Sequence, residues 1–259
     1  SFFTLSVGIG ALAIFGSYIG KERRLTGEAI SITVLDTIVA LVAGLIIFPS
    51  CFAFDVNPGQ GPGLVFVTLP NVFREMAGGR IWGALFFLFM SFAAFSTIIA
   101  VFQNIIQFAR DMWGISLKKS VLINGVLLIL LAVPCVLGMT DWAGFSIGGK
   151  SIMDIEDFLV SNNLLPIGSL VYLLFCMTRY GWGWDNFIAE ANAGTGMKFP
   201  KSLRGYVAYG IPAIVIVIYL KGYYDKFKDS SPVIFGVWMM IAIVFAVYIL
   251  YLSRDKKVK

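Results

Sequence analysis

The chain has 259 residues, of which 58% are hydrophobic and only 14% are charged. Soluble domains carry roughly 25% charged residues, so this composition excludes an ordinary soluble domain and predicts an integral membrane protein. The chain contains no histidine, the commonest general base and metal ligand, and its three cysteines form no CxxC pair. A metalloenzyme or a disulfide scaffold therefore has little support.

Seven apolar runs come close to the length that crosses a membrane, since a hydrocarbon core of about 30 Å needs about 20 apolar residues. The runs cover residues 2–19, 29–48, 81–108, 121–137, 158–177, 207–220 and 233–252. They predict an all-α polytopic membrane protein that forms a single transmembrane domain.

The first run is interrupted between Thr4 and Gly10, where two hydroxyls and two glycines replace the usual Leu, Ile and Val. Irregular backbone is stable inside a bilayer only where it is buried in protein or lines a cavity, because unpaired N–H and C=O groups are costly in hydrocarbon. The pattern favours a site for a polar ligand or an ion. A glycine-kinked helix without a ligand explains the same residues equally well.

Asp36 lies near the middle of the second run, where a carboxylate costs about 2.5–3.5 kcal/mol on insertion scales. Intramembrane carboxylates usually face a polar interior and bind an ion, a proton or a base. A functional role is therefore favoured over a structural hydrogen bond to a neighbouring helix.

Residues 50–79 form a long loop between the second and third runs. A Gly/Pro cluster at 57–63 is followed by an apolar stretch that Pro70 divides and that is too short to span a membrane. This pattern is typical of a structured loop with short helices, and long ordered loops are usually functional. We expect an extracellular lid, although a plain surface cap has the same composition.

Ala93, Ser96 and Thr97 lie on one face of the third predicted helix, because they are three and four residues apart. A backbone carbonyl and two hydroxyls are hard oxygen ligands that suit a small hard cation. Hydroxyls in membrane helices, however, often donate to a carbonyl of the preceding turn, and the residues alone favour this simpler interpretation.

A group of acidic residues precedes the fifth run, at Asp154, Glu156 and Asp157. Carboxylates at a helix start stabilise the helix dipole, which is the simpler interpretation. The alternative is an outer gate that pairs with an arginine elsewhere in the protein.

The basic residues indicate an orientation in the membrane. If all seven runs span, fourteen of the twenty Lys and Arg residues lie on one side, which should be cytoplasmic. We therefore expect a multi-pass protein of the plasma (inner) membrane with its C-terminus in the cytoplasm, and a lipid bilayer rather than nucleic acid as its partner. No charged leader precedes the first run, so we expect no signal peptide and expect the chain to be the C-terminal part of a longer protein.

Together these segments resemble the neurotransmitter:sodium symporter family, in its bacterial branch. The resemblance covers nearly the whole chain, and its motifs occur in the family's order. They are Phe2-Phe3-Thr4-Leu5-Ser6, Val34-Leu35-Asp36, 43–48, 61–66, Pro70, 91–97 and 154–158. The resemblance implies helices six to twelve of a twelve-helix, broken-helix sodium symporter fold, with this chain holding the second inverted repeat and two extra helices.

The resemblance also implies roles for individual residues. The substrate contacts would be Phe3, Thr4, Ser6, Ile9, Ser96 and Val101. The sodium ligands, divided between two sites, would be Thr4, Asp36, Ala93, Ser96 and Thr97. Asp157 would be the outer-gate carboxylate, with Asp154 as the alternative.

Two positions depart from the family pattern. Asp36 stands where the family often has an asparagine sodium ligand, and Ala40 stands where chloride-dependent members have a serine. We therefore expect no chloride requirement, because the Asp36 carboxylate supplies the compensating negative charge itself. That charge is either fixed or protonatable, and a protonatable one would allow proton antiport.

The implied function is sodium-coupled symport of an amino acid or a related small zwitterion, with Na⁺ as the bound ion, no organic cofactor and no enzyme activity. In the family, helices one to five donate the remaining sodium and substrate contacts, so we expect the missing N-terminal half as a partner. An isolated, non-transporting fragment is the main alternative. A heptahelical receptor is disfavoured by the interrupted first run and by the lack of an Asn-Pro-x-x-Tyr motif near the last one.

Overall fold

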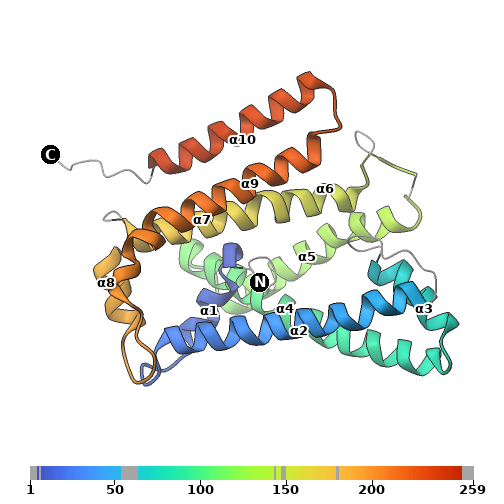
Figure 1. Cartoon of the computed structure of the whole chain (residues 1–259), viewed down its shortest axis with the longest axis horizontal. Helices are drawn as coiled ribbons and strands as arrows, with labels where there is room; N and C mark the ends of the chain where they lie inside the picture. The colour runs from blue at the N-terminus through green and yellow to red at the C-terminus, as the bar shows by residue number, and fades with distance from the viewer. Residues whose placement is uncertain are drawn as a thin grey trace. The chain divides into compact units, whose positions relative to one another are not determined.

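The computed structural model describes residues 5, 7–53, 64–142, 144–146, 150–178 and 181–252. Within that part the regular structure is helical, with isolated β-bridges but no extended strand, which confirms the all-α prediction. In chain order (Figure 1) the elements are η1 (Val7–Ile9), α1 (Ala11–Ser17), α2 (Leu25–Ala53), η2 (Leu64–Thr68), α3 (Leu69–Glu75), α4 (Gly79–Trp113), α5 (Leu117–Met139), α6 (Ile152–Leu159), η3 (Val160–Leu164), α7 (Leu165–Met177), α8 (Trp184–Ala191), η4 (Lys201–Leu203), η5 (Tyr206–Gly210), α9 (Ile211–Phe227) and α10 (Pro232–Leu252).

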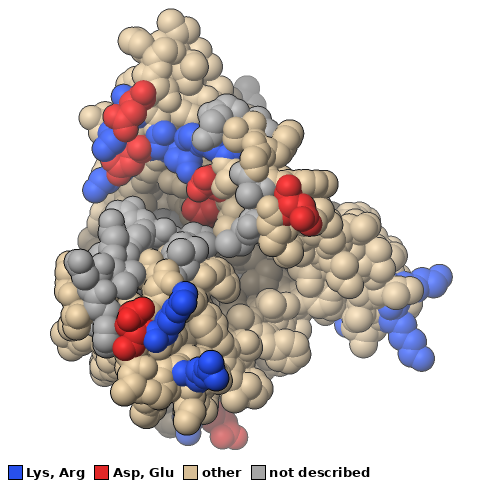
Figure 2. All heavy atoms as spheres, turned by 90° about the vertical axis from the view of Figure 1, so that its right-hand side faces the viewer, with Lys and Arg blue, Asp and Glu red and all other residues tan. Residues whose placement is uncertain are grey.

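Six helices in the described part are long and apolar enough to cross a membrane. They are Leu25–Ala53, Gly79–Trp113, Leu117–Gly138, Ile152–Met177, Lys201–Phe227 and Pro232–Leu252. Each contains one of the predicted runs. The first predicted run, 2–19, differs because its described part is divided at Gly10 into η1 and α1. Figure 2 shows one face of the molecule, on which charged side chains form a few small groups among uncharged residues.

The chain forms two compact units. One contains residues 30–100, and the other contains residues 2–29 and 101–259, so α2 and α4 each run from one unit into the other. The described cysteines, Cys51, Cys135 and Cys176, are all free thiols. No disulfide among them therefore holds the fold together.

In the unit of residues 30–100, two short helices, η2 and α3, follow α2. Phe73 on α3 contacts Phe86 and Phe87 on α4, with ring centroids 5.4 and 6.3 Å apart. A φ of 73° at Gly78 permits the tight turn between α3 and α4. These are the short helices that the 50–79 pattern predicts, and the lid role stays a prediction; residues 54–63 of this loop lie outside the described residues.

In the other unit, an aromatic core joins α6, α9 and α10, and α9 and α10 run side by side (Figure 1). The Phe227 and Trp238 rings stack with centroids 5.0 Å apart. Lys150, in the loop before α6, places its ammonium 4.8 Å from the Phe227 centroid. Burial there lowers the pKa of Lys150, the Lys226 charge lowers it further, and Asp154 acts in the opposite direction.

A clip of hydrogen bonds joins residues 22–24 to the segment after α8. The Thr195 N–H donates to the Glu22 carbonyl at 2.9 Å, and the Arg24 N–H donates to the Thr195 carbonyl at 3.2 Å. The Arg24 guanidinium also donates to the carbonyls of Asn192, at 3.1 Å, and Gly196. Backbone and side chain thus fasten two loops that are far apart in the sequence.

Helix α6 begins with a capping box. The Asp154 N–H donates to the Ser151 hydroxyl at 3.2 Å, while the Ser151 hydroxyl and N–H donate to the Asp154 carboxylate at 2.7 and 3.2 Å. These bonds satisfy N–H groups that have no partner within the helix. Asp154 therefore has the helix-start role that the simpler interpretation of the acidic group predicts.

Replacing Ser151 with alanine should lower the free energy of unfolding by about 1 kcal/mol, because the cap loses its acceptor. Thermal unfolding of the purified protein in detergent measures the change. Ser116 is a matched control, since it is the N-cap of α5 but makes no side-chain capping bond. Equal losses for Ser151→Ala and Ser116→Ala would contradict this account of the cap.

Candidate functional site

The backbone of the first run breaks at Gly10. Gly10 has φ 79° and ψ 12°, a left-handed conformation that glycine adopts without steric cost. The N–H groups of Ala13 and Ile14 both donate to the Gly10 carbonyl, at 3.0 and 3.2 Å. In a continuous α-helix, Ala13 would donate to Ile9 instead. The predicted interruption is therefore confirmed, and it leaves the Ile9 carbonyl outside the helical hydrogen-bond ladder.

The segment before the break lies directly against the backbone of α7. A Cβ added to Gly8 would overlap the Leu165 carbonyl, and a Cβ added to Gly168 would overlap the Gly8 carbonyl. Glycine is therefore required on both sides of this contact. The two glycines hold the broken segment against a helix that is long enough, together with α6, to span the membrane.

A side chain from α4 reaches the break. The Asn104 amide donates a hydrogen bond to the Ile9 carbonyl, and the donor and acceptor are 95 residues apart in the sequence. The Tyr172 hydroxyl and the Asn104 amide nitrogen both lie next to Gly10, where the Tyr172 hydroxyl would collide with any added Cβ. Neither Asn104 nor Tyr172 was predicted from the sequence, because a single polar residue in an apolar helix shows no spacing pattern.

The three oxygens predicted on α4 do gather on one face. The Ser96 hydroxyl donates to the Ala93 carbonyl at 2.7 Å, and the Thr97 hydroxyl donates to the same carbonyl at 3.2 Å. This is the local bonding that the residues alone favoured. A hydroxyl that donates its hydrogen keeps its lone pairs, so the Ser96 and Thr97 oxygens remain hard acceptors, while the Ala93 carbonyl accepts from both of them; the cation site stays a prediction.

The other predicted site residues divide between the two units. Asp36 is half-buried on α2, in the same unit as the oxygens of α4. Ile9 and Val101 are half-buried in the second unit. Asp157 is exposed on α6 and accepts a hydrogen bond of 2.7 Å from the Ser161 hydroxyl. The remaining predicted residues, Phe3, Thr4 and Ser6, lie outside the described residues.

Comparison with known proteins decides the family. The profile of the Sodium:neurotransmitter symporter family matches residues 1–253. The chain belongs to the sodium:neurotransmitter symporter family. The resemblance found in the sequence motifs is thereby confirmed, and the heptahelical receptor is excluded.

Individual relatives support the assignment. An uncharacterized sodium-dependent transporter of Haemophilus influenzae is 32% identical over 85% of this chain and 48% of its own length. The Bacillus subtilis transporter YhdH is 31% identical over 85% of this chain and 49% of its own. The crystal structure of MhsT in complex with L-phenylalanine superposes with a TM-score of 0.73 and 33% identity, over 85% of this chain and 50% of MhsT. The chain thus spans about half the length of these relatives.

Two cavities among the described residues were not predicted from the sequence. The first, of about 670 Å³, lies in the unit of residues 2–29 and 101–259 and combines apolar walls with polar and charged groups. Its lining residues are Ile14, Ser17, Tyr18, Gln103, Ile106, Gln107, Arg110 and Leu117. The Arg110 guanidinium donates to the Gln107 side chain at 3.3 Å, and Gln107 donates to Asp111 at 2.9 Å, so the charged end of this cavity is held by hydrogen bonds along α4.

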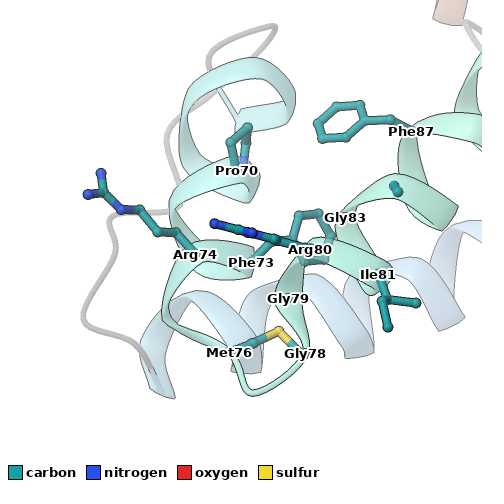
Figure 3. Close-up of a pocket in the computed structure, with 11 residues that line it drawn as sticks. Pro70, Phe73, Arg74, Met76, Gly78, Gly79, Arg80, Ile81, Gly83 and Phe87 are labelled. Atoms are coloured by element: carbon teal, nitrogen blue, oxygen red, sulfur yellow. The ribbon is translucent and has the colours of Figure 1, made fainter.

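The second cavity, of about 790 Å³, lies between α3 and the start of α4. Figure 3 shows Phe87 pointing from α4 towards α3, while Arg74 extends away from the helix pair. Gly83 lines the same space, where an added Cβ would lie 3.4 Å from the Phe73 ring. Most lining residues are apolar or glycine, two are arginines, and the loop for which the lid is predicted forms only part of the wall.

Proposed function

We propose that this chain is half of a sodium-coupled symporter that carries an amino acid or a related small zwitterion across the plasma membrane. The observation that carries the proposal is the break at Gly10, because the main chain of a predicted membrane run leaves the helical hydrogen-bond pattern there, in a chain that belongs to a sodium symporter family. The naming of its relatives as sodium-dependent transporters and the L-phenylalanine bound to MhsT support the ion and the substrate class.

The oxygen-bearing residues would hold sodium. In our proposal, the Ala93 carbonyl and the hydroxyls of Ser96 and Thr97 form one site, and Thr4 with the Asp36 carboxylate contributes to the other. Both use hard oxygen ligands, which suit a cation of this kind. The Asp36 charge offsets that of the ion within the membrane, so chloride is not required.

The apolar residues at the break would hold the substrate. Ile9 and Val101 line its side-chain pocket, Ser6 contributes a polar contact, Phe3 closes over it, and Asp157 belongs to the outer gate. Because Thr4 and Ser96 would contact both ligands, sodium binding stabilises the conformation that binds the substrate. This is thermodynamic linkage between two ligands. It requires that bound substrate raise the affinity for sodium by the same factor by which bound sodium raises the affinity for substrate.

The transporting unit would combine this chain with five further helices. The half-length match to the relatives supports this composition. The excess of basic residues in alternate loops supports a cytoplasmic C-terminus. We expect the chain reconstituted by itself to transport nothing and the longer protein to show sodium-driven uptake. Uptake by the longer protein would distinguish half of a working transporter from a non-transporting fragment.

Replacing Ser96 and Thr97 together with alanine should raise the sodium concentration for half-maximal uptake at least tenfold, because two ligands of one cation are lost. Uptake of radiolabelled L-phenylalanine into proteoliposomes under an inward sodium gradient measures this, with a panel of other amino acids in parallel. Ser91→Ala is the matched control, since the Ser91 hydroxyl on α4 donates to the Phe87 carbonyl at 2.7 Å and has no proposed ligand role. An unchanged sodium dependence in Ser96→Ala/Thr97→Ala would refute the sodium site.

A further inference from the structure

Within the described residues, no main-chain N–H is recorded as a donor to the Ile9 carbonyl. The N–H groups of Ala13 and Ile14 donate to the Gly10 carbonyl instead. An acceptor without a partner is costly in a membrane, where water is scarce. The only partner recorded for the Ile9 carbonyl among the described residues is the Asn104 side chain, which is half-buried on α4.

Asn104 does not bond within its own helix, as Ser91 and Asn124 do. The Ser91 hydroxyl on α4 and the Asn124 amide on α5 each donate to the carbonyl four residues before them in their own helix. The Asn104 amide donates instead to a segment 95 residues away. The missing side chain of Gly10 makes room for it, since an added Cβ would lie 3.1 Å from the Asn104 amide nitrogen.

We propose that Asn104 is a positioning residue that fixes the backbone at Ile9 and thereby sets where the Ile9 side chain stands in the substrate pocket. The inference rests on the proposed function, in which Ile9 lines that pocket. Asn104 acts through Ile9 and does not touch the substrate. Substrate affinity and selectivity should therefore depend on Asn104, whereas sodium affinity should change little.

The test uses Asn104→Leu, which keeps the approximate volume but removes the donor, and Asn104→Gln, which keeps the amide on a longer side chain. In the longer protein that contains this chain, equilibrium binding of L-phenylalanine at saturating sodium should weaken about tenfold in Asn104→Leu and recover in part in Asn104→Gln. Sodium binding measured without substrate should change less than twofold. Asn124→Leu is the matched control, because its amide bonds only within α5.

Hydrogen exchange gives a second readout that does not depend on transport. The peptide that covers residues 7–17 should exchange faster in Asn104→Leu than in the wild type and in Asn124→Leu. Unchanged exchange and unchanged L-phenylalanine affinity would overturn the proposal, and so would a loss of sodium affinity as large as the loss of substrate affinity. If no amino acid binds even to the wild type, the proposed function fails, whereas the exchange result still decides whether Asn104 holds the break.

Discussion

Replacing Asp36 with asparagine is expected to abolish sodium-driven uptake or to weaken its sodium dependence roughly thirtyfold. A charge-assisted contact contributes about 2 kcal/mol, which corresponds to that factor, and asparagine keeps an oxygen ligand while removing the charge. The measurement is uptake of L-phenylalanine into proteoliposomes as a function of sodium, in parallel series with chloride and with chloride replaced by gluconate.

The control is Asp225→Asn, which removes a carboxylate from an exposed position on α9. The wild type should transport at the same rate with and without chloride. If the asparagine variant gains a chloride requirement, the Asp36 charge replaces chloride, as proposed. If Asp36→Asn transports normally without chloride, Asp36 has no role in sodium coupling.

The second large effect is expected for Gly168→Ala. The new methyl group would overlap the Gly8 carbonyl, and a backbone neighbour cannot rotate away as a flexible side chain can. Overpacking typically lowers stability by about 1–3 kcal/mol. Here the overlap can be relieved only if the segment around Gly8 moves away from α7. We expect a lower unfolding temperature together with a loss of substrate binding.

Gly236→Ala is the matched control, and its effect on stability should be opposite in sign to that of Gly168→Ala. Gly236 lies inside α10 with nothing within 4 Å of an added Cβ. Alanine is preferred to glycine in a helix by roughly 0.5–1 kcal/mol, so this variant should be slightly more stable than the wild type. If Gly168→Ala is as stable and active as Gly236→Ala, the contact between Gly8 and α7 does not hold the break.

Six of the seven apolar runs lie within long helices of the described residues, and these helices extend beyond the runs. The helix that contains 207–220 extends to Lys201–Phe227, because residues such as Lys201 and Lys226 continue the helix beyond the apolar part. Apolar content marks only the part that lipid surrounds, whereas backbone hydrogen bonding continues into the polar ends. The capping box was readable in the sequence, since Ser151 and Asp154 have its spacing of three.

The break itself was predictable, but its partners were not. Two glycines among hydroxyls indicated irregular backbone, because glycine alone tolerates the left-handed conformation found at Gly10. Which residue satisfies the Ile9 carbonyl depends on how α4 packs beside η1, and no spacing along the chain encodes that. The same reason applies to the cavity lined by Tyr18, Gln103 and Leu117, which three separate helices form.

The clip at Arg24 has a practical consequence for engineering this protein. Surface loops are the usual places for a fluorescent reporter or an epitope. The turn around Thr195, however, is hydrogen-bonded to the residues that precede α2 and holds the start of that helix in place. Lengthening it would pull the Arg24 guanidinium from its carbonyls. The turn at Gly114, where an added Cβ meets open space, offers a safer point of attachment.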